Sequence, residues 1–179
     1  MKVVMLSNFM NHHQLSVCNR LSKLCDEFYF VGMETMPDAT RKFGYNDLNY
    51  LPYVRQFNET DFDASDVENM ICSADAVIWG AAPLRYLQFS LQRGKLTFIF
   101  SERIWKKGTC RRFIPFIRKK VERIFVNREN LYVLAASCYL ANDLRLINFP
   151  VERCLQWGYF PEVEKLDIEQ IIHSKYQEK

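Results

Sequence analysis

Glycine is scarce in this sequence: there are six glycines in 179 residues, and none precedes Gly32. A dinucleotide-binding domain places a G-x-G-x-x-G turn after its first strand, which lets the backbone approach the pyrophosphate closely. The sequence contains no such turn there and no Walker A phosphate loop. These absences argue against an NAD-dependent enzyme and against a P-loop kinase.

Long apolar runs and paired cysteines are also missing. No apolar run reaches the ~18–20 residues of a transmembrane helix, and the first apolar stretch turns polar at Ser7, too early for a signal peptide. We therefore expect a cytoplasmic protein. The six cysteines form no C-x-x-C pair, so we expect no metal site and interpret them as buried, reduced thiols.

Apolar and aromatic residues are abundant. They make up 49% and 15% of the chain, with 14 Phe and 9 Tyr, a composition that excludes intrinsic disorder. A chain of this length buries roughly 70% of its surface on folding. It can therefore build a full core without disulfides or metals.

Short apolar runs alternate with helical patterns along the chain. We expect strands at 2–6, 28–31, 51–57, 75–80, 96–100, 131–136 and 153–157, and helices at 14–25, 63–73, 83–94 and 139–147, with a long irregular loop at 33–50. This alternation is typical of a parallel sheet covered on both faces. The predicted fold is α/β, a Rossmann-like doubly wound domain with a mostly parallel sheet.

The ligand site of such a domain lies at the carboxyl ends of its strands. Four loops qualify: 7–13, 80–83, 101–107 and 137–139. The first contains His12 and His13, and a histidine there can act as a general base or simply bond to backbone at the start of a helix. The third contains Glu102 beside Arg103, which can hold sugar hydroxyls or form a local salt bridge.

Four motifs at these strand ends resemble one enzyme family. They are SNFMNHHQ at 7–14, FSERIWKKG at 100–108, LAASCYLANDL at 134–144 and LQWGYFPE at 155–162. Together they resemble bacterial family-1-type glycosyltransferases of capsular and surface polysaccharide clusters. The resemblance spans residues 1–166 and implies one half of a GT-B fold.

The resemblance also implies a domain organisation. Residues 1–162 would form the acceptor-binding domain and 163–179 a linker or terminal helix. The nucleotide-sugar donor would bind a C-terminal domain absent from this chain, so we expect no cofactor in residues 1–179 and no activity of this chain alone. The acceptor would be a polysaccharide or a lipid-linked sugar. The alternative from the residues is a non-catalytic α/β module that binds a sugar or a nucleotide.

Site residues follow from the same resemblance. His13, or its neighbour His12, stands where many such enzymes place a base or an acceptor contact, and Glu102 stands at a second acceptor-facing position. We expect His13 and Glu102 to be catalytic. The substrate contacts expected at the same strand ends are Asn11, His12, Ser101, Arg103 and Ser137.

Positive charge is concentrated in residues 103–128, which hold ten Lys or Arg against Glu122 alone. This window carries +9 and the rest of the chain −6, for the overall +3. Helical spacing places Phe113, Phe116 or Ile117, Val121 and Ile124 on one stripe. We expect Ile117, Val121 and Ile124 to be buried, with solvated charges at Lys106, Lys107, Arg111 and Arg112.

Two interpretations of this basic segment remain open. It is an ordinary crossover helix with a solvated face, or it docks on anionic lipid at the inner face of the plasma membrane. No recognition motif supports nucleic-acid binding.

Overall fold

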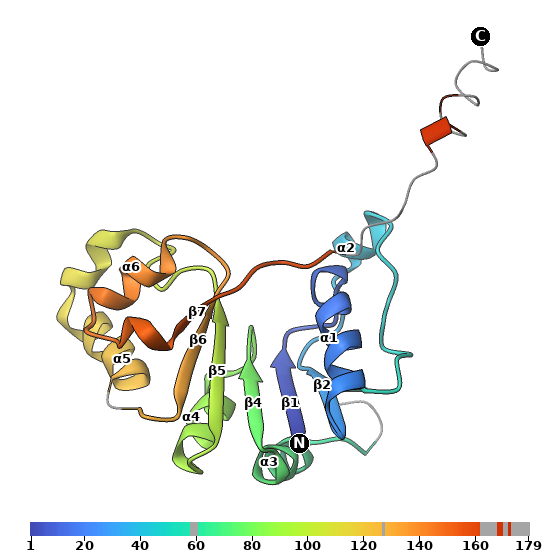
Figure 1. The fold of residues 1–179 in the computed structure, drawn as a ribbon, viewed down its shortest axis with the longest axis horizontal. Coiled ribbons are helices and arrows are strands. Elements are labelled where there is room, and N and C mark those ends of the chain that lie inside the picture. The colour runs from blue at the N-terminus through green and yellow to red at the C-terminus, as the bar shows by residue number, and fades with distance from the viewer. Residues whose placement is uncertain (58–60, 127, 162–167, 170–171, 173–179) are drawn as a thin grey trace.

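One sheet of seven parallel strands organises the domain, in the order β3–β2–β1–β4–β5–β6–β7 (Figure 1). This is a computed structural model, and it describes residues 1–57, 61–126, 128–161, 168, 169 and 172. The strands are β1 (Lys2–Ser7), β2 (Glu27–Gly32), β3 (Val54–Gln56), β4 (Ala76–Trp79), β5 (Leu96–Ser101), β6 (Leu131–Ala135) and β7 (Cys154–Gln156). The chain therefore has the predicted α/β, Rossmann-like doubly wound fold, and every strand pair in the described residues is parallel.

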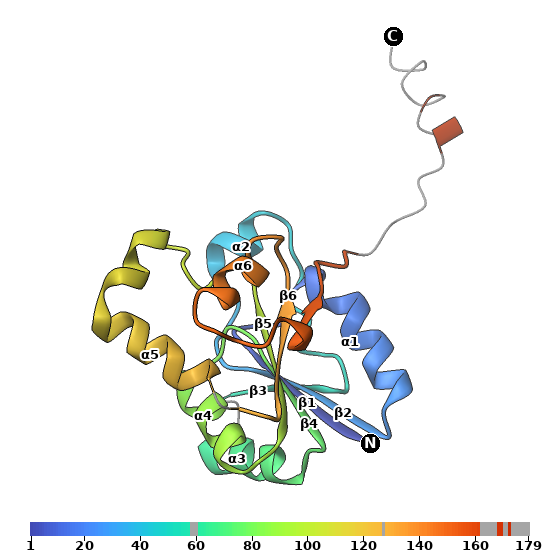
Figure 2. The same ribbon diagram turned by 60° about the vertical axis from the view of Figure 1, so that its left-hand side comes forward.

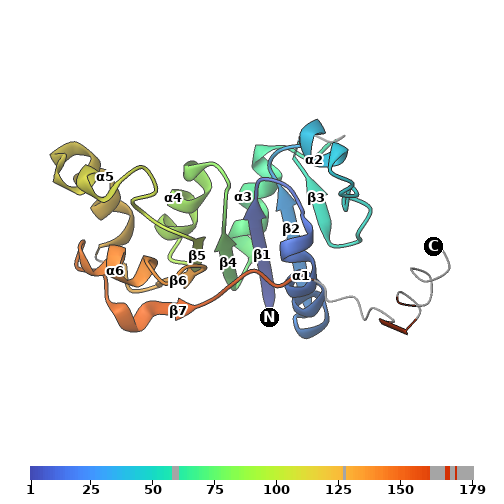
Figure 3. The same cartoon turned by 90° about the horizontal axis from the view of Figure 1, so that it is seen from above.

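Helices connect the strands. They are α1 (His12–Leu24), α2 (Asp38–Lys42), α3 (Ala64–Ser73), α4 (Leu84–Gln92), α5 (Pro115–Phe125) and α6 (Leu140–Arg145), with 3-10 turns η1 (Thr109–Phe113) and η2 (Val151–Arg153). Seen along the strands, α1 lies on one face of the sheet, and α3 and α4 lie on the other (Figure 3).

Alternate residues of the central strands supply the two faces of the core. Val3 and Met5 of β1 pack with Cys18 of α1 on one face. On the other face, Val4 and Leu6 pack with buried side chains of α3 and α4, including Val67, Ile71 and Tyr86. This two-sided burial explains why the central strands are nearly continuous apolar runs.

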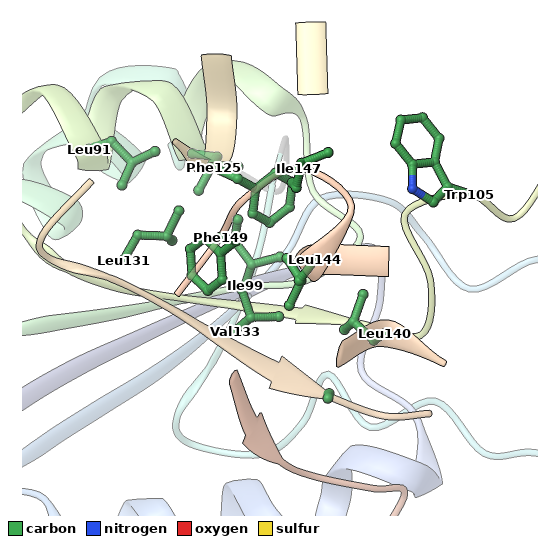
Figure 4. Close-up of a cluster of buried hydrophobic side chains, with 12 residues drawn as sticks. Leu91, Ile99, Trp105, Phe125, Leu131, Val133, Leu140, Leu144, Ile147 and Phe149 are labelled. Carbon is green, nitrogen blue, oxygen red and sulfur yellow. The ribbon is translucent and has the colours of Figure 1, made fainter. Parts of the chain in front are cut away.

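A third cluster fills the end of the sheet near β5 and β6 (Figure 4). Phe125 of α5 meets Phe149 edge to face, with ring centroids 5.9 Å apart. Leu140 and Leu144 anchor α6 in the same cluster, and Trp105 joins it from the loop after β5. The loop after β5 is thus tied to the core by a large aromatic side chain.

The helix boundaries follow local capping signals. The side chain of Asn11 accepts from the backbone N–H of His13 at the start of α1, and Asp63 forms a capping box with Asp66 at the start of α3. Pro115 opens α5, where its missing N–H costs no hydrogen bond. Gly94 ends α4 with φ +69°, which a side chain would strain.

The structure corrects several predictions. The loop 33–50 contains the short helix α2, and the edge strand predicted at 51–57 is limited to β3 because Pro52 has no N–H for a ladder. The basic segment is a loop, η1 and then α5, so Phe113 lies outside the helix and both Phe113 and Phe116 are exposed.

The cysteines are only partly as expected. All six are free, but only Cys18 is buried, and its burial raises the pKa of its thiol to about 12. Three others, Cys72, Cys110 and Cys138, are exposed, so interpreting them as buried thiols was wrong. Cys72 lies on α3, whose buried positions are taken by Val67 and Ile71, and Cys110 and Cys138 lie in η1 and in the loop after β6.

The predicted linker and terminal helix at 163–179 fall outside the described residues except for 168, 169 and 172. The domain boundary at residue 162 therefore stays a prediction. Of the helices that the structure describes, none has the length and apolar character needed to cross a bilayer.

Candidate functional site

A polar cleft lies where the strand order reverses, between β1 and β4, at the carboxyl ends of the strands. Its volume is about 700 Å³, within the range of small-molecule sites. Residues that follow β1, β4 and β5 line it, among them Asn8, Gly80 and Glu102. Three of the four predicted loops therefore meet here, as expected for a doubly wound sheet.

Glu102 is held in the cleft by two partners. Lys106 Nζ lies 2.6 Å from one carboxylate oxygen, and the hydroxyl of Tyr159 donates to the other. The Lys106 ammonium, followed by the Tyr159 hydroxyl, lowers the pKa of Glu102. Glu102 is consequently ionised near neutral pH and can only accept hydrogen bonds.

Tyr159 comes from the segment 158–161, which crosses from β7 toward α1 above the carboxyl ends of the strands (Figure 1). Its ring lies 5.8 Å from that of Phe100 and 5.2 Å from that of His13. The backbone N–H of Phe160 donates to the carbonyl of His13. Burial, then the bond to Glu102, raises the pKa of Tyr159 to about 12, so its hydroxyl keeps its proton.

The two histidines face different spaces. His13 is exposed and lines the cleft with Glu102. His12 lines a neighbouring pocket, where its ring stacks on Tyr45 at 4.3 Å. Burial and the adjacent His13 lower the pKa of His12. The structure thus brings His13 to the cleft together with Glu102 and places His12 beside it.

Of the remaining predicted substrate contacts, some line the cleft and one does not. Asn11 and Ser101 line the cleft. Ser137 does not: it lines a separate cavity and its hydroxyl donates to the backbone carbonyl of Glu102. Ser137 therefore supports the loop that presents Glu102.

Arg103 borders the cleft but is engaged by Asp143. Its guanidinium lies 3.2 Å from Asp143 Oδ1, and the buried Asp143 also accepts from the backbone N–H groups of Ile104 and Trp105. The local salt bridge weighed for Arg103 is present, with Asp143 rather than Glu102 as its partner. Asp143 fixes the course of the loop after β5.

A hydrogen-bonded chain forms another wall of the cleft. The amide nitrogen of Gln14 donates to Ser7 Oγ at 3.3 Å, and Ser7 donates to Asn8 at 3.2 Å. The amide oxygen of Gln14 is buried and has no partner among the described residues. This chain of hydrogen bonds fixes the side chain of Asn8, which lines the cleft.

Sequence reasoning did not assign Lys106, Tyr159 or Asp143 to the cleft or to the support of its loops. Lys106 lies in a loop that was singled out, four residues beyond Glu102. Tyr159 follows the last strand directly, so the strand-end rule that selected the other loops applies to it as well. Asp143 carried no such signal, because its partners are far away in sequence.

Removing the Lys106 ammonium should raise the pKa of Glu102 toward its ordinary value. A ¹³C-carboxyl NMR titration of wild type and Lys106→Met would show the Glu102 midpoint moving upward, with a smaller rise for Tyr159→Phe. Because the folded-state pKa is depressed, the pairing stabilises the fold above the unfolded pKa and is lost as pH falls through the folded pKa.

The control for this titration is Asp63, the N-cap of α3, whose midpoint should be the same in all three proteins. Identical Glu102 midpoints in wild type and Lys106→Met would contradict the pairing.

Among the described residues, no group of three His, Cys, Asp or Glu side chains is placed to hold a metal ion. No protein-family model matches the chain, and no curated protein sequence matches it either.

Among solved structures, the chain is similar to a UDP-GlcNAc 2-epimerase from Methanocaldococcus jannaschii. The TM-score is 0.49 and the identity 11%, over 89% of this chain and 46% of that one. The chain therefore spans about half the length of that protein, and at this identity the likeness concerns the arrangement of strands and helices only.

Proposed function

We propose that this chain is the acceptor-binding domain of a glycosyltransferase that moves a sugar from a nucleotide-sugar to a polysaccharide or a lipid-linked acceptor. The observation that carries the proposal is that His13 and an ionised Glu102 line one polar cleft at the switch point of the sheet. The four motifs that resemble glycosyltransferases all border this cleft or support its loops.

The lining of the cleft suits a glycan. Asn8, Asn11 and Ser101 carry groups that both donate and accept hydrogen bonds, matching sugar hydroxyls. Trp79 offers an apolar ring surface for the C–H face of a sugar. The carboxylate of Glu102 has lone pairs beyond those used by Lys106 and Tyr159, so it can also accept from a hydroxyl.

The two principal residues take different roles in this proposal. His13 removes the proton of the acceptor hydroxyl while that oxygen forms its bond to the anomeric carbon and the bond from that carbon to the nucleotide phosphate breaks. Glu102 has a depressed pKa, which makes it a weaker base. We therefore assign Glu102 to orienting the acceptor hydroxyl.

The alternative, a non-catalytic module that binds a sugar or a nucleotide, predicts different ligands for the isolated chain. We expect isothermal titration of residues 1–179 with UDP- and GDP-sugars to show no binding tighter than millimolar, since the donor would bind elsewhere. A panel of neutral and N-acetylated mono- and disaccharides should instead shift the ¹⁵N NMR signals of residues around Glu102 and Tyr159.

Glu102→Gln should weaken the saccharide response, and Glu68→Gln on α3 should leave it unchanged as the matched control. Micromolar binding of a nucleotide-sugar to this chain alone would contradict the proposal in favour of a nucleotide-binding module.

A further inference from the structure

The junction between η1 and α5 exposes four consecutive apolar residues, Phe113, Ile114, Pro115 and Phe116, here termed the apolar corner. The side chains of Phe113 and Phe116 are 71% and 73% exposed, and Ile114 is 38% exposed. Solvent contact on this scale by two neighbouring phenylalanines is costly for a free surface.

The inward face of α5 begins after the apolar corner, and the expectation that Ile117, Val121 and Ile124 are buried holds only in part, because all three are partly buried. Phe125 is buried, and Ile117, Val121 and Ile124 pack against the core cluster near β5 and β6. The apolar side chains of this segment therefore fall into two groups, one that packs on the core and one that faces solvent. Its inner stripe anchors α5, while Phe113 at the end of η1 and Phe116 in the first turn of α5 are exposed to solvent.

Basic side chains surround the apolar corner. Arg111 and Arg112 precede it, and Arg118, Lys119 and Lys120 follow it. The guanidinium of Arg112 lies over the ring of Phe113, 4.7 Å from its centroid. In the part of the chain that the structure describes, the only carboxylate paired with any of these five is Glu122, which bonds Arg118.

Exposure alone does not distinguish this site, because Phe43 and Tyr50 are 81% and 77% exposed. The charge around them differs. Arg41 beside Phe43 is paired with Asp47, and Asp38 offsets Lys42. An aromatic pair within a strongly cationic surface occurs at the apolar corner and not at Phe43.

The corner is also continuous with the cleft. The chain leaves β5 at Ser101, contributes Glu102 and Lys106 to the cleft, and reaches Phe113 through Lys107 and η1. In two views, η1 and α5 lie at the outer edge of the domain, far from α1 (Figures 1 and 2). A surface in contact with the corner would leave the cleft open beside it.

We propose that the apolar corner and its basic surround dock this chain on an anionic lipid bilayer. Phe113 and Phe116 insert among the lipid headgroups and upper acyl chains, and Arg111, Arg112, Lys119 and Lys120 contact lipid phosphates. Charge complementarity selects the occupant: a symmetric contact with a second copy of this chain would bring two cationic patches together. This inference does not depend on the proposed enzymatic function.

Vesicle co-sedimentation of the full 179-residue chain tests it, with vesicles of phosphatidylcholine alone or with 30% phosphatidylglycerol. Binding should require phosphatidylglycerol and weaken sharply in 1 M salt, where the Debye length is ~3 Å against ~10 Å at 0.1 M. Reversing four charges of the basic surround should weaken vesicle binding by about 10²-fold or more. The four changes are Arg111→Glu, Arg112→Glu, Lys119→Glu and Lys120→Glu.

Insertion is tested separately from charge. Phe113→Ala with Phe116→Ala should weaken vesicle binding by about tenfold, while Phe43→Ala with Tyr50→Ala, equally exposed aromatics, should not change it. The matched charge control is Arg20→Glu, Lys23→Glu, Lys42→Glu and Arg93→Glu. Phe116→Trp should add fluorescence that brominated lipid quenches beyond the quenching of wild type.

Three results would overturn the proposal. The first is no sedimentation with anionic vesicles at low salt. The second is equal loss of binding in the corner variants and their matched controls. The third is that the Phe113→Ala/Phe116→Ala variant keeps vesicle binding unchanged but loses another interaction. That interaction would be a concentration-dependent dimer in sedimentation velocity or tight binding of a single-stranded RNA oligomer.

Discussion

Replacing Asp143 with alanine is expected to lower the free energy of unfolding by about 3 kcal/mol. The Asp143 carboxylate is 4% exposed and accepts from Arg103 and from the backbone N–H groups of Ile104 and Trp105. Alanine leaves those two N–H groups without their acceptor, at about 1–3 kcal/mol each. Arg103 is partly exposed and can turn to water, so it adds little.

Thermal and urea unfolding would measure this loss, which corresponds to a fall in Tm of about 6–12 °C for a chain of this size. Asp143→Asn should lose less, because the amide oxygen can still accept from the two N–H groups. Glu122→Ala is the control, since its pair with Arg118 is half-exposed on one helix and is worth at most about 0.5 kcal/mol. Equal stability of Asp143→Ala and Glu122→Ala would refute the role assigned to Asp143.

Tryptophan fluorescence gives a local measurement of the same effect. Trp105 is 2% exposed and packs in the core cluster near β5 and β6. Because Asp143 holds the backbone of Trp105 directly, Asp143→Ala should shift tryptophan emission to longer wavelength before global unfolding. Asp143→Asn should shift it less.

Turnover should fall by about 10²-fold or more when His13 is replaced by alanine in a transferase that carries this domain together with its donor domain. His13 is exposed and lines the same cleft as Glu102, whose carboxylate Lys106 and Tyr159 keep ionised and weakly basic. We therefore assign the role of base to His13 and not to Glu102. His13→Gln should lose as much, because it keeps hydrogen bonding but cannot take the proton.

Binding to the isolated chain separates catalysis from recognition. Saccharide affinity of residues 1–179 should change less than about threefold on His13→Ala, if the residue acts mainly as a base. His12→Ala is the matched comparison: its ring stacks on Tyr45 in the neighbouring pocket, so its loss of turnover should be smaller. A loss confined to acceptor KM would assign His13 to binding, and unfolding of His13→Ala would assign it to the fold.

The order of elements was predictable because it depends on local patterns. Apolar runs such as Lys2–Leu6, caps such as Asp63 and breakers such as Gly94 act within a few residues of their positions. The strand-end rule then selected three loops that do meet in one cleft. In the fourth loop, the Ser137 hydroxyl instead donates to the backbone carbonyl of Glu102. The strand-end rule selects loops and does not predict the direction in which a side chain of the loop points.

The sequence by itself determined the α/β class, the alternation of strands and helices, and the concentration of charge in residues 103–128. Each of these follows from residue type and short spacing. Only the tertiary structure decided that Glu102 pairs with Lys106 and Tyr159, that Asp143 binds Arg103, and that Phe113 and Phe116 face solvent. The physical reason is that these outcomes depend on which distant segments share a space once the sheet is assembled, and on which apolar side chains its limited area can cover.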